Sequence, residues 1–154
     1  MTRAESLIQI EQEVGALIRR VRRVIGDRAR AVHEGLQPSA YLLLAHLAEQ
    51  GPSRSSAVVE AFEIDKGAIS RQVQHLVDLG LVVRDADPAD GRAMLLTVTP
   101  EAERRLTEVA RQRRTLLDER LGEWTEADLQ VLVSALRRYN RALEPAPVGT
   151  DLAH

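Results

Sequence analysis

The chain has 154 residues, of which 44% are apolar and 29% charged, with a formal net charge of −2 at pH 7 and no cysteine. This balance is typical of a folded protein of one domain or two interlocked lobes, and the lack of cysteine excludes a disulfide scaffold, a cysteine nucleophile and a thiolate metal site. No apolar run could span a bilayer and residues 1–30 lack a signal-peptide layout, so we expect a cytoplasmic protein with no membrane partner. Any basic surface must be local, and Lys66 is the chain's single lysine.

The first predicted element is one long helix over residues 5–32. Its apolar side chains are spaced by threes and fours, which places them on one stripe of the helix. They are Leu7, Ile10, Val14, Leu17, Ile18, Val21, Val24 and Ile25. We expect the helix to fray or bend near Gly26 and to be finished by Gly35.

Three shorter helices are predicted next. The first begins around Pro38 and ends at Gly51, and the second is centred on Val58. The third runs over residues 66–79, with Asp65 as its N-cap and Gly80 beyond its end.

The pattern then changes to short strands, predicted over residues 81–83 and 94–98 because both are rich in β-branched and aliphatic residues. The intervening residues 84–92 contain Asp, Pro and Gly, which predicts a hairpin with a projecting loop. Three short helices followed by a hairpin is the plan of a winged helix-turn-helix, here residues 36–98. The expected fold class is therefore mainly α with a small β-hairpin wing.

Two further helices are predicted after the hairpin. Thr99 caps a helix that extends to about Gly122. Thr125 caps the last helix, with Asp128 at the box position and Trp124 and Leu129 placed as a hydrophobic staple. This helix is expected to bury Leu129, Leu132, Val133, Leu136, Tyr139 and Leu143. Residues 146–154 are predicted to be a disordered tail.

One face of the predicted helix 66–79 is built from small, hydrogen-bonding and cationic residues. These are Gly67, Arg71, Gln74 and Asp78, with Ser70 and His75 on the flanks and Lys66 in the first turn. Such a face suits contact with base edges, since Arg pairs with guanine and Gln with adenine. A solvated surface helix is the alternative interpretation.

The hairpin tip carries Arg92 beside Asp90. An arginine at this position can enter a DNA minor groove, with the carboxylate holding the guanidinium in orientation. The alternative is a plain turn in which Arg92 balances the neighbouring aspartates.

Together these segments resemble the MarR family, the multiple-antibiotic-resistance regulators of bacteria and archaea. Residues 64–84 are similar to that family's recognition helix and first wing strand. Asp87-Pro88-Ala89-Asp90-Gly91-Arg92, followed by Leu95-Leu96-Thr97-Val98-Thr99-Pro100-Glu101, is similar to its wing.

The resemblance implies a homodimer that binds double-stranded DNA at a pseudo-palindromic operator and is released by a small phenolic or lipophilic effector. It implies dimerisation helices in residues 1–35 and 99–145 around a DNA-binding lobe in residues 36–98. The matched positions imply a set of DNA-contacting residues: Lys66, Gly67, Ser70, Arg71 and Gln74 in the major groove, Arg92 oriented by Asp90 in the minor groove, and Ser53 and Arg54 at the start of the third helix on phosphate.

Two features count against this interpretation. The first is Glu63, which stands where the family often has glycine in the helix-turn-helix turn; the other departure, Val98 in place of a leucine, is conservative. Residues 54–92 hold five cations against seven carboxylates, so we expect only modest non-specific affinity for phosphate. The alternative function is a helical dimeric protein–protein module whose winged lobe does not bind DNA.

Enzymatic, metal and cofactor functions have no support in the sequence. The four histidines lack ligand spacing, and there is no phosphate-binding glycine loop or nucleophile elbow. Candidates for an effector pocket are Arg22, Tyr41, His46 and Trp124, and core or interface packing is the alternative for each.

Overall fold

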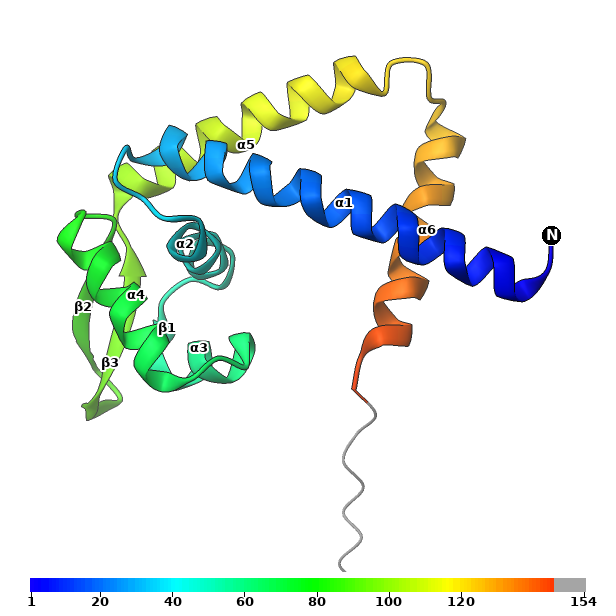
Figure 1. The fold of residues 1–154 in the computed structure, drawn as a ribbon. Helices are drawn as coiled ribbons and strands as arrows, with labels where there is room; N and C mark the ends of the chain where they lie inside the picture. The colour runs from blue at the N-terminus through cyan, green and yellow to red at the C-terminus, as the bar shows by residue number, and fades with distance from the viewer. Residues whose placement is uncertain (146–154) are drawn as a thin grey trace, which may run out of the picture. The chain divides into compact units, whose positions relative to one another are not determined.

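A computed structural model describes residues 1–145 of the chain (Figure 1). The predicted disordered tail, residues 146–154, lies outside the described residues. The chain divides into two compact units, residues 1–112 and residues from 113 onward, so the boundary falls within helix α5 (Pro100–Arg120).

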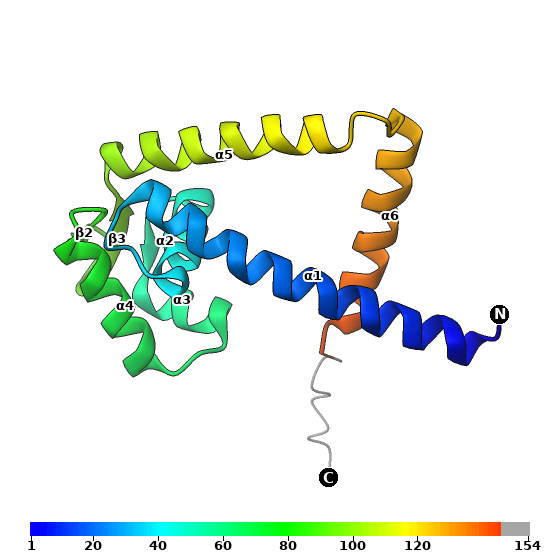
Figure 2. The ribbon, with the colours of Figure 1, turned by 45° about the horizontal axis from the view of Figure 1, so that its top comes forward.

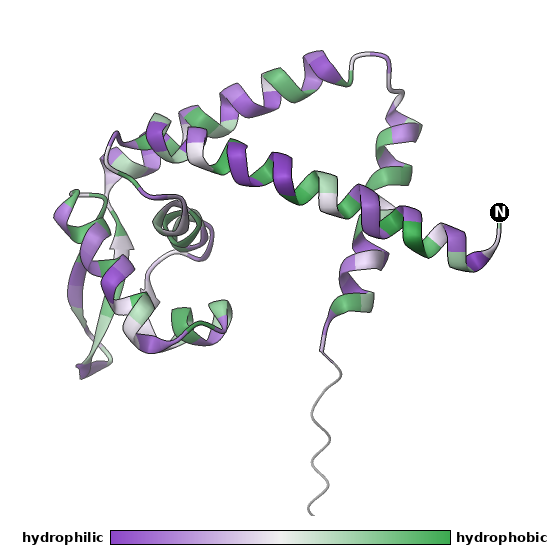
Figure 3. Cartoon of the chain, viewed as in Figure 1, coloured by the Kyte–Doolittle hydropathy of each residue, from purple (hydrophilic) through white to green (hydrophobic). Residues whose placement is uncertain are grey.

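Helix α1 (Arg3–Val32) begins at a capping box in which the Thr2 hydroxyl accepts a hydrogen bond from the Glu5 N–H and the Glu5 carboxylate accepts one from the Thr2 N–H. Fraying at Gly26 is excluded because the helix is unbroken there, a bend at Gly26 remains a prediction, and the helix is finished before Gly35 as predicted. The helix continues through Gly26 and its C-cap is His33, because a single glycine in a long amphipathic helix does not by itself break the hydrogen-bond ladder. Figure 3 shows the hydrophobic residues recurring along α1.

Helices α2 (Pro38–Gln50), α3 (Ser55–Phe62) and α4 (Lys66–Asp78) form the predicted three-helix cluster. Helix α2 contacts α1, α4 and strand β3 (Asp90–Val98), as Figure 2 shows from a second direction. Its buried leucines are the centre of the core of this unit, together with Ile69, Leu76 and Leu96. Their burial is the main stabilising term for this lobe.

The turn between α3 and α4 departs from the glycine that the family pattern favours. Glu63 is the C-cap of α3 and has φ 50 and ψ 30, the left-handed conformation. It is the only non-glycine residue with positive φ in residues 1–145. The helix-turn-helix turn is therefore kept, at the steric cost of a side chain in a conformation that glycine adopts freely.

The sheet has three antiparallel strands in the order β1-β3-β2, where β1 is Ser53–Arg54 and β2 is Val82–Asp87. The predicted mainly helical class with a β wing is confirmed, but the hairpin strands are longer than predicted. Residues 84–87 and 90–93 continue the strands, and only Pro88 and Ala89 form the turn. The charged, turn-prone residues of the wing have weak strand propensity, and pairing across the hairpin overrides it.

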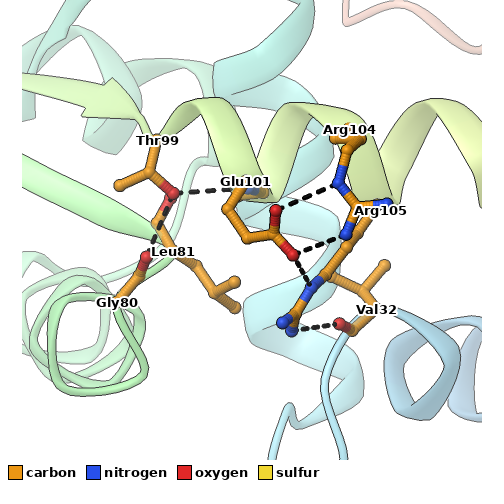
Figure 4. Close-up of polar contacts among 8 residues, drawn as sticks. Val32, Gly80, Leu81, Thr99, Glu101, Arg104 and Arg105 are labelled. Carbon is orange, nitrogen blue, oxygen red and sulfur yellow. Dashed lines mark hydrogen bonds and ion pairs between the residues drawn. The ribbon is translucent and has the colours of Figure 1, made fainter.

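Helix α5 begins directly after Thr99, which is its N-cap as predicted. The Thr99 hydroxyl oxygen accepts a hydrogen bond from the Ala102 N–H at 3.3 Å. The same hydroxyl donates to the Gly80 carbonyl at 3.0 Å, which ties the start of α5 to the end of the α4 segment (Figure 4).

In the second unit, α6 (Glu126–Leu143) begins at the predicted capping box of Thr125 and Asp128. The expected burial of its apolar residues is wrong for the single chain, in which α6 has no buried residue. An apolar stripe on one helix predicts a buried face but not whether that face is covered within the same chain.

Candidate nucleic-acid interface

A groove of about 520 Å³ lies where the first turns of α3 and α4 approach the wing. Four of the side chains that line it are cationic. The cationic groove, as we call it, is lined by Arg54, Ser55, Ser56, Val59, Lys66, Ile69, Ser70, Val73, Arg84, Arg92, Ala93 and Met94. None of these lining residues is acidic, although the whole chain carries a net charge of −2.

The first turn of α4 is fixed by its N-cap. The Asp65 carboxylate accepts hydrogen bonds from the N–H groups of Gly67 and Ala68 at 3.0 and 3.2 Å, and these bonds lower the pKa of Asp65. Lys66 and Ser70 follow on the exposed side of the helix and line the cationic groove. The carboxylate at the cap thus stays ionised and holds the end of the helix that carries Lys66.

Arg71 lies on the other flank of α4. It is exposed and lines a separate hollow of about 300 Å³ with Gln37, the N-cap of α2, with Ser39 and Ala40 of α2, and with Ala68, Gln72 and His75 of α4. Ser70 and Arg71 therefore border different hollows on the two sides of the same helix. The predicted contacts of both residues with DNA remain predictions.

Gln74 is held in a side-chain network. Its Nε2 donates to Asp78 Oδ1 at 2.7 Å and its Oε1 accepts from Arg84 Nη1 at 2.9 Å. The contact of Gln74 with a base remains a prediction. It requires the amide of Gln74 to give up its bonds to Asp78 and Arg84 in favour of bonds to the base. Arg84, which the sequence analysis did not select, is placed in the groove by strand β2, where it shares a face with buried Val82 two residues earlier.

Ser53 and Arg54 were predicted to contact phosphate at the start of the third helix. They form strand β1, directly ahead of α3, and both side chains have partners. The Ser53 hydroxyl donates to the Gly51 carbonyl at 2.8 Å. The Nε and Nη2 atoms of Arg54 each lie 2.6 Å from Asp87 Oδ2. The guanidinium of Arg54 is therefore bound to a carboxylate of the wing.

In the structure Asp90 is bonded to the backbone of Arg92, and its predicted role in orienting the Arg92 guanidinium on DNA remains a prediction. Its Oδ1 accepts a hydrogen bond from the backbone N–H of Arg92 at 3.1 Å, so it shapes the start of β3. The reason is local: a carboxylate two residues before an N–H closes a compact Asx turn. The Arg92 side chain is exposed and lines the cationic groove.

The four candidate effector residues have different local surroundings, and their predicted role remains a prediction. Tyr41 is 6% exposed within the core, and the ring of His46 packs edge-to-face against Phe62 with centroids 5.0 Å apart. These contacts favour the packing alternative for both residues. Arg22 is exposed on α1, and Trp124 belongs to the second unit, where it is 44% exposed.

A second polar cluster joins α5 to the end of α1 (Figure 4). The Glu101 carboxylate accepts hydrogen bonds from Arg104 at 2.7 and 3.0 Å and from Arg105 at 2.8 Å, and these bonds lower its pKa to about 2. Arg105 also donates to the carbonyl of Val32, the last residue of α1, at 3.0 Å. This cluster ties the first turns of α5 to the end of α1.

Within residues 1–145, no group of three or more His, Asp or Glu side chains is arranged to hold a metal ion. No helix in the same range has the length and apolar character needed to cross a membrane.

Comparison with known proteins identifies the class. A family model described as MarR family matches residues 34–93. The uncharacterized HTH-type transcriptional regulator YxaD of Bacillus subtilis (strain 168) is 34% identical over 133 residues, which cover 86% of this chain and 92% of that protein. The HTH-type transcriptional repressor MdtR of the same organism is 25% identical and is matched over 62% of each chain.

The fold is also similar to that of solved structures. One is from Listeria monocytogenes and is described as a MarR family transcriptional regulator complexed with 26mer DNA. It has a TM-score of 0.69 and 18% identity, and the match covers 85% of this chain and 86% of that one. This chain belongs to the MarR family and is a transcriptional regulator with a winged helix-turn-helix fold.

Proposed function

We propose that this regulator binds double-stranded operator DNA through the cationic groove and the exposed face of α4. The observation that carries the proposal is the groove itself: four cations and no carboxylate line it in a chain that is anionic overall. Arg and Lys on one surface are the groups that neutralise DNA phosphates, and hydroxyl groups such as those of Ser55 and Ser56 add hydrogen bonds to them.

Within this proposal the parts of the interface have different tasks. Gly67, Ser70, Arg71 and Gln74 face base edges in the major groove from α4, and Arg92 enters the adjacent minor groove from the wing. Support comes from the exposure of Arg71 and Arg92 and from the cap at Asp65, which fixes the first turn of α4. Phosphate contacts then position the protein and the α4 side chains provide sequence preference.

The proposal includes a homodimer whose two lobes occupy the halves of a pseudo-palindromic site. Support comes from the apolar stripe of α1, where Leu7, Ile10, Leu17, Val21 and Val24 are each at least 37% exposed in the single chain. Together with Val14 between them, they alternate at spacings of three and four residues, the heptad pattern of a helix–helix seam. Residues 1–35 and 99–145 are the proposed dimerisation segments.

We further propose that the regulator is a repressor that responds to a small effector. Support for repression is the description of MdtR as a repressor. An effector of phenolic or lipophilic character is the expectation that the family resemblance carries. Arg22, Tyr41, His46 and Trp124 remain its candidate contacts.

The test begins with a labelled duplex enriched from a random pool by the full-length protein. We expect the logarithm of its binding constant to fall linearly with the logarithm of salt concentration, as phosphate contacts release counterions. Failure to enrich any duplex would reject DNA binding. It would favour the alternative protein–protein module, whose apolar contacts would be nearly insensitive to salt.

A further inference from the structure

Asp87 is the only buried charged or polar residue in residues 1–145, with 8% of its surface exposed. It is the last residue of β2, where the register of the hairpin shifts between Ala86 and Asp87. A buried carboxylate is costly unless it is paired and hydrogen-bonded. Since the residues around Asp87 in the wing are exposed, the burial of this carboxylate must be explained by its specific partners.

Both carboxylate oxygens of Asp87 have partners. Oδ2 lies 2.6 Å from Nε and 2.6 Å from Nη2 of Arg54, and Oδ1 accepts the N–H of Ala89 at 2.9 Å. The first partner belongs to β1 and the second to the turn at the tip of the wing. One carboxylate thus connects the tip of the hairpin to the segment that enters α3. Its pKa is lowered chiefly by the Ala89 N–H and also by Arg54, so it remains ionised.

We propose that Arg54 and Asp87 are positioning residues that hold the wing tip, and with it Arg92, at the edge of the cationic groove. The inference rests on the proposed function in so far as Arg92 contacts DNA. In the β1-β3-β2 sheet, β1 pairs with β3 only at Leu95 and Leu96, so no strand beside β3 supports the tip residues other than β2. The ion pair between Arg54 and Asp87 joins the two outer strands across that gap.

The proposal assigns Arg54 a different role from the other cations of the groove. A guanidinium already bound to a buried carboxylate contributes little net positive charge to phosphate binding. Arg54 would therefore affect DNA binding through the position of Arg92 and not through its own charge. The two roles of Arg54, positioning the wing or binding phosphate, predict opposite changes in operator affinity when Asp87 is replaced.

The decisive variant is Asp87→Asn, with Asp85→Asn as the matched control. Asp85 is an exposed carboxylate on the same strand, and its removal also deletes one negative charge beside the DNA. If Arg54 simply binds phosphate, Asp87→Asn should tighten operator binding at least as much as Asp85→Asn. If the pair positions the wing, Asp87→Asn should weaken binding about fivefold, while Asp85→Asn leaves it unchanged or slightly tighter.

A double-mutant cycle with Arg92→Ala then locates the effect. We expect Asp87→Asn to change affinity by less than about twofold once Arg92 is absent, since the two residues act through one contact. An equal loss with and without Arg92 would overturn the proposal.

Arg54→Lys serves as a second variant in case Asp87→Asn folds poorly. It keeps the positive charge but loses the two-donor geometry of the guanidinium, so it should weaken binding without changing the salt slope. Unchanged binding by Arg54→Lys would also overturn it.

Hydrogen exchange on the free protein separates this inference from DNA binding. In Asp87→Asn, the amides of residues 86–92 should exchange faster, whereas in Asp85→Asn they should keep the wild-type rate. If the wild-type chain enriches no duplex, the proposed function fails while faster exchange still supports the tie between Arg54 and the wing tip. Unchanged exchange in Asp87→Asn overturns the tie whether or not DNA binds.

Discussion

At the scale of single residues, the interface separates side chains that are free to meet a partner from side chains that are already bound. Lys66 and Arg92 are exposed on the groove, whereas Arg54 is bound to Asp87 and Arg84 donates to Gln74. Formal charge alone therefore overstates how many cations can reach DNA. The effect of a substitution depends on which of these two groups its residue belongs to.

Substitution of Arg92 should affect binding and leave folding intact. We expect Arg92→Ala to weaken operator binding at least about tenfold, equivalent to roughly 1.4 kcal/mol, with an unchanged melting temperature. The loss should be largest for operators with A·T-rich flanks, where a narrow minor groove attracts arginine. Anisotropy titrations and thermal melts on one preparation test this. A melting temperature that falls enough to explain the lost affinity would contradict a contact with DNA.

Arg71 and Lys66 should differ in the kind of binding they lose. Arg71→Ala is expected to cost roughly 1–3 kcal/mol and to blur preference at one base position, as for a paired contact with a base edge. Lys66→Ala is expected to weaken all duplexes about equally and to reduce the salt slope by about one. Titrations against the enriched duplex and its single-base variants distinguish the two. Sequence-independent losses for both residues would assign Arg71 to the backbone.

At the scale of elements, the joint at the start of α5 is held by ionised groups. The Glu101 carboxylate, with a pKa of about 2 in the folded chain against an ordinary value of 4.5, receives hydrogen bonds from Arg104 and Arg105. Because folding lowers the pKa of Glu101, its ionised carboxylate stabilises the folded state at pH values above the ordinary pKa of 4.5. That contribution is lost as the pH falls from about 4.5 towards 2.

Glu101→Gln should therefore flatten the acid side of the stability curve. We expect the variant to be less stable than the wild-type chain at pH 6, and the difference to shrink progressively between pH 4.5 and pH 2. Denaturant midpoints measured across this range provide the check. Glu103→Gln, a substitution in the same first turn of α5, is the control. A difference that stays constant with pH would show that the ionised carboxylate is not responsible.

The sequence was sufficient for elements whose signals are local and insufficient for those that depend on distant pairing. Asp65, Thr99 and Thr125 are all capping residues as predicted, because a cap needs only the next three residues. Strand β1 consists of two residues that are a strand only because they pair with Leu95 and Leu96. The Arg54–Asp87 pair, 33 residues apart, likewise has no local signature, and each residue alone reads as a solvated charge.

At the scale of the whole molecule, each of the two units leaves apolar surface uncovered. In α1 this surface follows spacings of three and four residues, and on one face of α6 Leu132, Leu136 and Leu143 are 39%, 43% and 64% exposed. No helix in residues 1–145 is long and apolar enough to cross a membrane, so a membrane-spanning role does not account for this surface. Contiguous exposed apolar surface of this kind marks a site of association with another protein surface. A second copy of the chain is the occupant we propose.

A single charge on the seam of α1 should weaken that association. We expect Leu17→Asp, at a position 52% exposed in the single chain, to shift the protein from dimer to monomer or to aggregate. Gln12→Asp adds the same charge at an exposed position on the opposite side of the helix and should remain dimeric. Light scattering coupled to size exclusion measures both. A Leu17→Asp dimer of wild-type stability would remove α1 from the interface.

The chain's single lysine has a practical consequence for measuring occupancy. Lys66 is the single lysine of the sequence, so it is the only side chain that an amine-reactive reagent can acylate, and it is the first residue of α4 on the cationic groove. Acylation removes the charge that a phosphate would meet, and a duplex bound as proposed would shield the same nitrogen, so the two events should exclude one another. We therefore expect the extent of Lys66 labelling in a brief pulse to report the fraction of DNA-free interface, without a probe on either molecule.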